Sequence, residues 1–183
     1  MAIVLDGSNG ITTNSGTVIS ASTIGVGGAT PSTSGAGITF PATQSASSNA
    51  NTLDDYEEGT WTPTYYGSST AGTTTYTSQA GTYVKIGNSV YCECLLTWTA
   101  KTGTGDGLVG GFPFAVDSYT TDSRALFYIG AYSGYSITGT LSGVVQASGT
   151  NLILYSNNNG SLAGSAIQNS GTMRFQFWYR SSN

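Results

Sequence analysis

The sequence predicts an all-β protein, in which an extended N-terminal arm precedes a jelly-roll-like antiparallel β-sandwich. Apolar residues at every second position over 90–98 and 173–180 indicate strands with one buried face. Pairs such as Gly87-Asn88 and Ser148-Gly149 mark tight turns between the apolar segments. Convincing helical spacing is missing, and short strands separated by turns are typical of a sandwich.

The sandwich is expected over residues 59–183, a stretch long enough to bury a core and fold as a unit. Trp98 shares one face of its strand with Val90 and Leu96, so we expect it in that core. The expected strands are 60–66, 83–86, 90–98, 125–132, 136–147, 152–155 and 173–180.

The composition favours a folded chain made of short strands. Charged residues make up 8% of the sequence, against about 25% in typical soluble domains. Aromatic residues reach 11% and the net charge is only -4, whereas disordered chains usually combine few aromatic residues with a high net charge. Small polar residues together with many Tyr and Trp suit strands joined by tight turns.

Residues 1–58 are interpreted as an extended arm that ends in an acidic hinge. Its apolar residues are isolated within Gly-, Ser- and Thr-rich sequence, and they are too few to offset the entropy lost when the arm becomes ordered. We therefore expect the arm to become ordered on a larger assembly. The predicted contact residues are Ile3, Val4, Leu5, Ile11, Val18, Ile19, Ile24, Val26, Ile38 and Phe40.

Several function classes are disfavoured by the residue types present. The chain has no His, which removes the commonest general base and most metal sites, so we expect no enzyme activity, no metal and no cofactor. The five basic residues are scattered, which argues against nucleic-acid binding. Apolar runs are too short to cross a membrane, and no secretory signal is recognised. Cys92 and Cys94 are expected to be buried reduced thiols.

The acidic cluster formed by Asp54, Asp55, Glu57 and Glu58 is the strongest candidate for chemistry. Paired carboxylates serve glycoside hydrolysis or Ca²⁺ binding. The cluster lacks the spacing of a calcium loop, and adjacent acids on an extended chain point in opposite directions. A solvated linker or polar interface is therefore favoured over a cation site, and a cation site over catalysis.

Aromatic and basic side chains supply two further sets of candidate residues. Trp178 alternates with core positions and shares its face with Arg174 and Arg180. We expect this face, together with Trp61, at the surface or in a subunit interface. Residues 128–135 form an aromatic and Gly-rich segment, interpreted as a loop whose Tyr128, Tyr132 and Tyr135 are candidate glycan contacts.

Two segments around the acidic cluster resemble the virion proteins of tailed bacteriophages, especially those of cyanobacterial phages. They are Gly-Ile-Thr-Phe-Pro-Ala-Thr-Gln at 37–44 and Asn-Thr-Leu-Asp-Asp-Tyr-Glu-Glu-Gly-Thr-Trp-Thr-Pro at 51–63. The stretches 83–88, 96–105 and 111–114 continue the resemblance, which spans roughly residues 37–114. It implies a homotrimer whose N-terminal arm attaches to the virion.

The resemblance leaves open where on the virion the protein lies. Because a short arm and one β domain suit a protein placed directly on a surface, the first hypothesis is a capsid cement or decoration protein. It would bind the major capsid protein on the outer surface of the head through its arm. The alternative is a short tail fibre or head fibre that binds host-surface glycan. A polysaccharide-cleaving spike is disfavoured because acids do not converge in the sequence.

Overall fold

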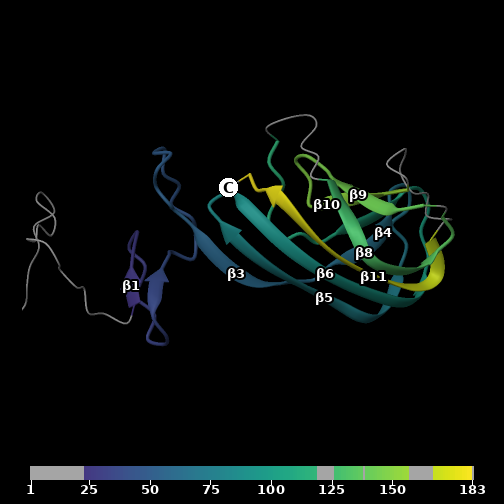
Figure 1. Ribbon diagram of the computed structural model, residues 1–183, viewed down its shortest axis with the longest axis horizontal. Helices are drawn as coiled ribbons and strands as arrows, with labels where there is room; N and C mark the ends of the chain where they lie inside the picture. Colours follow the sequence, from purple (N-terminus) through teal and green to yellow (C-terminus); the bar gives the residue numbers. More distant parts are fainter. Residues whose placement is uncertain (1–22, 119–125, 138, 157–166, 183) are drawn as a thin grey trace, which may run out of the picture. The chain divides into compact units, whose positions relative to one another are not determined.

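A computed structural model of the 183-residue chain describes residues 23–118, 126–137, 139–156 and 167–182. The chain divides into two compact units, Met1–Ala42 and Thr43–Asn183, each of which is described by itself. All described elements are β-strands (Figure 1). The predicted all-β class is thereby confirmed.

The described part of the first unit contains two short parallel strands, β1 (Thr23–Gly25) and β2 (Gly37–Thr39). The Val26 amide donates a hydrogen bond of 3.0 Å to the Thr39 carbonyl and extends this pairing. Ile24, Val26 and Ile38 nevertheless remain 39%, 37% and 57% exposed. Phe40 is half-buried. The unit therefore leaves apolar side chains uncovered, while the predicted arm contacts from Ile3 to Ile19 lie outside the described residues.

The second unit is a nine-stranded antiparallel arrangement in the order β3-β5-β6-β11-β8-β9-β10-β7-β4. Its strands are β3 (Tyr56–Trp61), β4 (Thr64–Gly67), β5 (Thr74–Ile86), β6 (Ser89–Lys101), β7 (Gly107–Gly110), β8 (Leu126–Tyr135), β9 (Leu141–Val145), β10 (Asn151–Ser156) and β11 (Ile167–Arg180).

Strand β8 belongs to two layers at once, because it pairs with β11 on one side and with β9 on the other. The first layer, β3-β5-β6-β11-β8, faces the second, β8-β9-β10-β7-β4, across one hydrophobic core (Figure 1). Tyr65 of β4 stacks on Trp98 of β6 across this core, with ring centroids 6.2 Å apart. The chain therefore forms a β-sandwich, and the predicted core position of Trp98 is confirmed by its 1% exposure.

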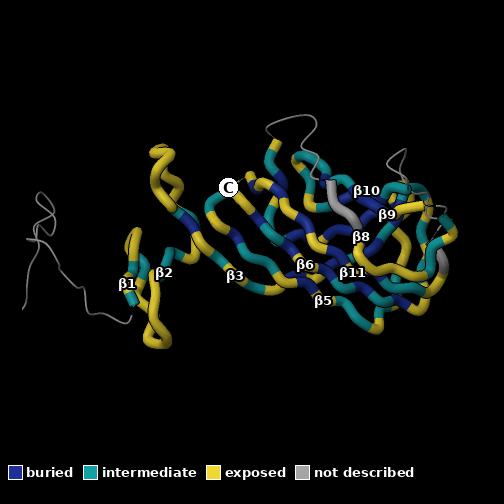
Figure 2. Tube along the Cα trace, in the orientation of Figure 1, coloured by how far each residue is buried: buried dark blue, intermediate teal, exposed yellow. Residues whose placement is uncertain are grey.

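Alternating burial along β6 and β11 creates the two faces of the first layer (Figure 2). Successive side chains of a strand point to opposite faces of a sheet. Core-facing residues on β11 include Met173, Phe175, Phe177 and Tyr179, and the residues between them are exposed. The opposite face of this layer is left to the solvent.

The layer begins earlier than the predicted domain start at residue 59. Tyr56 to Trp61 pair with Ile86 to Gly81 of β5, so the expected boundary between 58 and 59 falls inside β3. The Gly87 amide also donates a hydrogen bond of 3.0 Å to the Asp55 carbonyl. Backbone pairing of the acidic segment therefore places it in the second unit.

Gly81 gives this layer room for a large ring. A Cβ atom at Gly81 would lie 2.3 Å from the indole nitrogen of Trp61. The same indole N–H donates to backbone carbonyls of Thr82 and Glu93, at 3.2 and 3.0 Å. Trp61 is 6% exposed, so its predicted surface or interface position is wrong. Its ring instead packs edge-on against Phe112 and Phe177.

Candidate functional site

The solvent-facing side of the β3-β5-β6-β11-β8 layer is the candidate site and is called the outer face below. Strands β6 and β11 occupy its centre, and their register pairs Tyr91 with Trp178, Glu93 with Gln176 and Leu95 with Arg174. Because paired residues point to the same side of a sheet, aromatic, polar and cationic groups follow one another along two strands.

An exposed aromatic pair lies on the outer face. The rings of Tyr91 and Trp178 are 4.7 Å apart between centroids and inclined at 45°. Trp178 is 60% exposed, whereas the other two tryptophans are buried in the core. A large ring held rigidly by its strand and left open to solvent offers an apolar surface at little further entropic cost on binding.

A hydrogen-bond network adjoins the aromatic pair. The Tyr91 hydroxyl lies 2.6 Å from Gln176 Oε1 and 3.0 Å from Glu93 Oε1. The Thr82 hydroxyl donates to Glu93 Oε2 at 3.0 Å. Desolvation first, and then the hydrogen bond to Glu93 and its charge, raise the pKa of Tyr91 above its ordinary value. The Tyr91 hydroxyl helps to hold the Glu93 carboxylate in position.

A groove of about 600 Å³ lies beside this network. The charged groups of the groove come from Glu93 and from the exposed Arg174. The small residues Gly130 and Ala131 of β8 leave space at one side. A Cβ atom at Gly130 would meet nothing within 4 Å. The lining residues are Ala80, Gly81, Thr82, Glu93, Cys94, Leu95, Gly130, Ala131, Arg174, Phe175 and Gln176.

Arg180 lies further along β11 and forms an ion pair with Asp117 at the surface. Its Nε donates to Asp117 Oδ2 at 2.9 Å, and its side chain is 66% exposed. Exposed pairs of this kind contribute little to stability because water screens them. Arg174, Trp178 and Arg180 thus share one face, but only Arg174 lines the groove.

The acidic cluster is divided between several roles. Asp54 Oδ2 accepts a hydrogen bond of 2.7 Å from the Ser47 amide, which is the main reason why the pKa of Asp54 is lowered. Glu57 is half-buried and Glu58 exposed on β3. No group of three His, Cys, Asp or Glu residues able to hold a metal ion occurs within the described residues.

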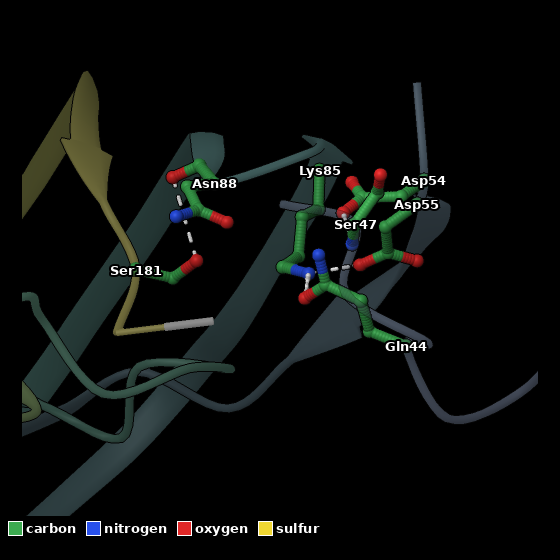
Figure 3. A network of polar contacts seen from close by, with 7 residues as sticks. All are labelled: Gln44, Ser47, Asp54, Asp55, Lys85, Asn88 and Ser181. Carbon is green, nitrogen blue, oxygen red and sulfur yellow. Dashed lines mark hydrogen bonds and ion pairs between the residues drawn. The ribbon is translucent and has the colours of Figure 1, made fainter. Parts of the chain in front are cut away.

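Asp55 departs most from the expected solvated linker or polar interface, because it is fully buried. Its Oδ2 contacts Lys85 Nζ on β5, and the Lys85 side chain is 1% exposed (Figure 3). Lys85 Nζ also donates to Gln44 Oε1 at 3.3 Å and lies 5.2 Å from the centre of the Phe114 ring. A buried carboxylate loses its hydration and needs a partner of opposite charge. The contact with Lys85 supplies that partner and makes the burial of Asp55 possible.

The predicted glycan loop is a strand instead. Residues 128–135 lie in β8, whose hydrogen bonds to β11 keep them extended. Tyr132 is 38% exposed, and its hydroxyl donates to the Gly139 carbonyl at 3.1 Å. Tyr135 packs edge-on against the buried Trp98, and burial raises its pKa well above the ordinary value. The side chain of Tyr128 lies outside the described residues.

Sequence reasoning missed Tyr91, Glu93 and Gln176 as functional candidates. The alternation over 90–98 and 173–180 places them on the outer face, but it does not reveal which residue lies opposite which. Cys92 and Cys94 are free and buried, which confirms their expected state. In the described part of the chain, no helix suited to crossing a membrane is found.

Comparisons with known proteins bear on the fold. No protein-family model matches this sequence, and no curated protein sequence matches it. The fold is similar to that of the Dettilon tailspike protein, with a TM-score of 0.54 over 68% of this chain and 12% sequence identity. The chain spans 24% of the length of that tailspike chain. At this identity the likeness concerns the fold alone.

Proposed function

We propose that this chain is a non-enzymatic structural protein of a tailed-bacteriophage virion, of the tail-fibre or tailspike kind, whose outer face binds host-surface glycan. The single observation that carries the binding role is the open aromatic pair of Tyr91 and Trp178 next to the groove that Glu93, Arg174 and Gln176 line. Sugar rings present apolar C–H faces and many hydroxyls. A flat indole beside Gln, Glu and Arg side chains offers complementary surfaces for both.

The virion assignment is supported by two independent likenesses. The segment 51–63 resembles phage virion proteins, and the sandwich is similar in fold to a protein that is, by its name, a tailspike. The first hypothesis from the sequence was a cement protein on the capsid. It rested on the short arm and the single β domain. The fold likeness favours the alternative, a position on the tail.

The absence of enzyme activity is part of the proposal. Glycoside hydrolysis usually needs two carboxyl groups about 5–10 Å apart around the bond to be cleaved. Among the described residues that line the groove, Glu93 is the one acid. Two hydroxyls hydrogen-bond to it, an arrangement that suits a fixed acceptor for ligand hydroxyls.

The binding role is tested by replacing Trp178 with Ala and titrating the protein with a panel of purified bacterial surface polysaccharides. We expect about tenfold weaker binding to the polysaccharide that the native protein recognises, equivalent to about 1.4 kcal/mol. Because Trp178 is exposed, the thermal unfolding midpoint should stay unchanged. Equal affinity of the two proteins would contradict the role of the aromatic pair.

A second variant tests the groove itself. Gly130→Leu places a side chain where a Cβ atom meets nothing, so the strand should tolerate it while the groove is partly filled. Binding should weaken with this variant too. The matched control is Thr99→Leu, which adds a leucine side chain at an exposed β6 position outside the groove and should leave binding unchanged.

A further inference from the structure

Lys85 and Asp55 bring an amine and a carboxyl group into direct contact in the interior of the second unit (Figure 3). Both side chains are shielded from water, with exposures of 1% and 0%. Asp55 Oδ1 has no hydrogen-bond partner among the described groups, so the pairing with Lys85 satisfies one carboxylate oxygen only. A buried ion pair is stabilising only when its remaining polar atoms are also satisfied, and this one falls short of that condition.

We propose that Lys85 and Asp55 condense to form an intramolecular isopeptide bond. Transfer of one proton within the pair converts ammonium and carboxylate into a neutral amine and a carboxylic acid. The Nζ lone pair then attacks Cγ of Asp55, and a tetrahedral centre forms. An Nζ proton moves to the departing hydroxyl, the C–O bond breaks and one water molecule leaves. The product is an amide between Nζ and Cγ, with no oxidant or further reactant.

The surroundings favour each part of this step. Reactive groups held in contact can reach effective molarities on the order of 10⁵–10⁸ M, which replaces the activation that a free acid would need. The Phe114 ring lies 5.2 Å from Nζ, and Gln44 Oε1 accepts a hydrogen bond from it, so the amine is both covered and oriented. Burial of both side chains also keeps out the water that would hydrolyse the product.

Glu57 is the acidic side chain that the strand register places next to the pair. It lies directly opposite Lys85 in the β3–β5 pairing and alternates onto the same face. Both Glu57 and Asp55 contribute electrostatically to the raised pKa of Tyr83, after the larger effect of desolvation. We assign to Glu57 the transfer of the proton from Nζ to the leaving hydroxyl.

The bond would join the residue before β3 to the end of β5, which lie 30 positions apart in the chain. It would close a loop in the unfolded chain as a disulfide does. The inference does not depend on the proposed glycan binding, since the pair lies in the interior.

The test is the intact mass of the full chain, purified in native form and then denatured. The proposal expects a mass lower than that of the sequence by one water molecule. Proteolysis should yield the peptide that contains Asp55 joined to the peptide that contains Lys85. A full sequence mass, or separate recovery of the two unmodified peptides, would overturn the proposal.

A control variant distinguishes the isopeptide bond from another reaction that also lowers the mass by one water molecule. The Asp106-Gly107 sequence can lose water by cyclising to a succinimide. Lys85→Arg retains that route and the positive charge but lacks the attacking amine. The full sequence mass is expected for this variant, and an equal loss of water would place the reaction elsewhere and overturn the proposal. Peptide mapping of the native chain decides the matter even if the variant does not fold.

Glu57→Gln tests the proton transfer separately. Loss of a general acid–base group slows such a step by about 10²–10⁴-fold. The variant should therefore fold but lose water far more slowly in a time course after refolding, and Glu57→Asp should recover part of the rate. An unchanged rate would overturn the assignment of this role to Glu57.

Discussion

Lys85 shows how one buried residue can decide the position of a whole segment. Its amine contacts Asp55 and reaches Gln44, two residues that precede the first strand of the sandwich. Asp54 closes the same segment on itself by accepting a hydrogen bond from the Ser47 amide. These contacts make residues 44–55 part of the folded unit, although their composition is that of a linker.

Replacing Lys85 with Ala should destabilise the second unit by about 3–5 kcal/mol, because it removes the link to Asp55, whether ionic or an amide, and leaves a buried carboxylate without a partner. Denaturant unfolding monitored by Trp fluorescence measures this change. The double variant Lys85→Met/Asp55→Leu is the matched control: it removes the buried charge and should recover the part of the loss that comes from the unpaired carboxylate. If Lys85→Ala unfolds at the native midpoint, the pair does not hold the segment.

Single residues also mark where prediction from the sequence reaches its limit. The core position of Trp98 follows from its place in an alternating strand, and so does the outward direction of Trp178. Trp61 lies at the end of a strand rich in Glu, Gly and Thr, and its burial depends on the space that Gly81 leaves opposite. That space results from strand pairing, which local sequence does not encode.

Strands β6 and β11 are the elements that the sequence predicts well, since a buried apolar residue occupies every second position over 90–98 and 173–179. Strand β5 spans 13 residues, but only 83–86 were expected, because Thr, Ser and Gly dominate its first part. Such residues form a strand here because β6 pairs with them along its whole length. The outer face crosses several strands. The sequence therefore predicts only the part of it that β6 and β11 supply.

The two thiols of β6 predict how the sandwich responds to alkali. Burial raises the pKa of Cys92 to about 12 and that of Cys94 further above its ordinary value of 9.0. Above pH 9 the unfolded chain loses thiol protons that the folded chain keeps. Folding stability should therefore fall as pH rises, with a slope for each thiol that approaches about 1.4 kcal/mol per pH unit once the unfolded thiol is fully ionised.

Denaturant unfolding at pH 8, 9 and 10 measures this dependence. A Cys92→Ala/Cys94→Ala variant should be less stable at pH 8 because of lost packing, but its stability should change less between pH 9 and 10. A slope identical to that of the native chain would show that other groups, such as the buried Tyr65 with a pKa of about 12, cause the alkaline loss.

At the scale of the whole molecule, the two units predict different effects of two deletions. Removing residues 1–42 keeps Gln44, Asp55 and all of β3, so a soluble folded sandwich is expected. Removing residues 1–58 deletes Asp55 and half of β3, and should leave an unstable chain. Circular dichroism and thermal unfolding of both truncations test this. Equal stability of the two would show that the acidic segment is dispensable.

The same truncation tests whether the arm attaches the protein to a virion. The chain without residues 1–42 should no longer bind virions that lack this protein, whereas the full chain should. Retained binding would place the attachment in the sandwich instead.

Copy number separates the two positions on the virion. Quantitative gel analysis should find a few to a few tens of copies for a tail protein, all in the tail fraction. Hundreds of copies in the head fraction would favour the capsid-decoration role first expected from the sequence, and would contradict the proposed tail position.

The sharing of β8 by both layers has a mechanical consequence. A sandwich of two separate sheets can shear along its apolar interface, because that contact is non-directional. Here a pull that slides one layer over the other must also break the backbone hydrogen bonds of β8 to β11 or to β9. Force applied to one sheet is thus carried into the other through a continuous hydrogen-bonded path, as in a folded plate.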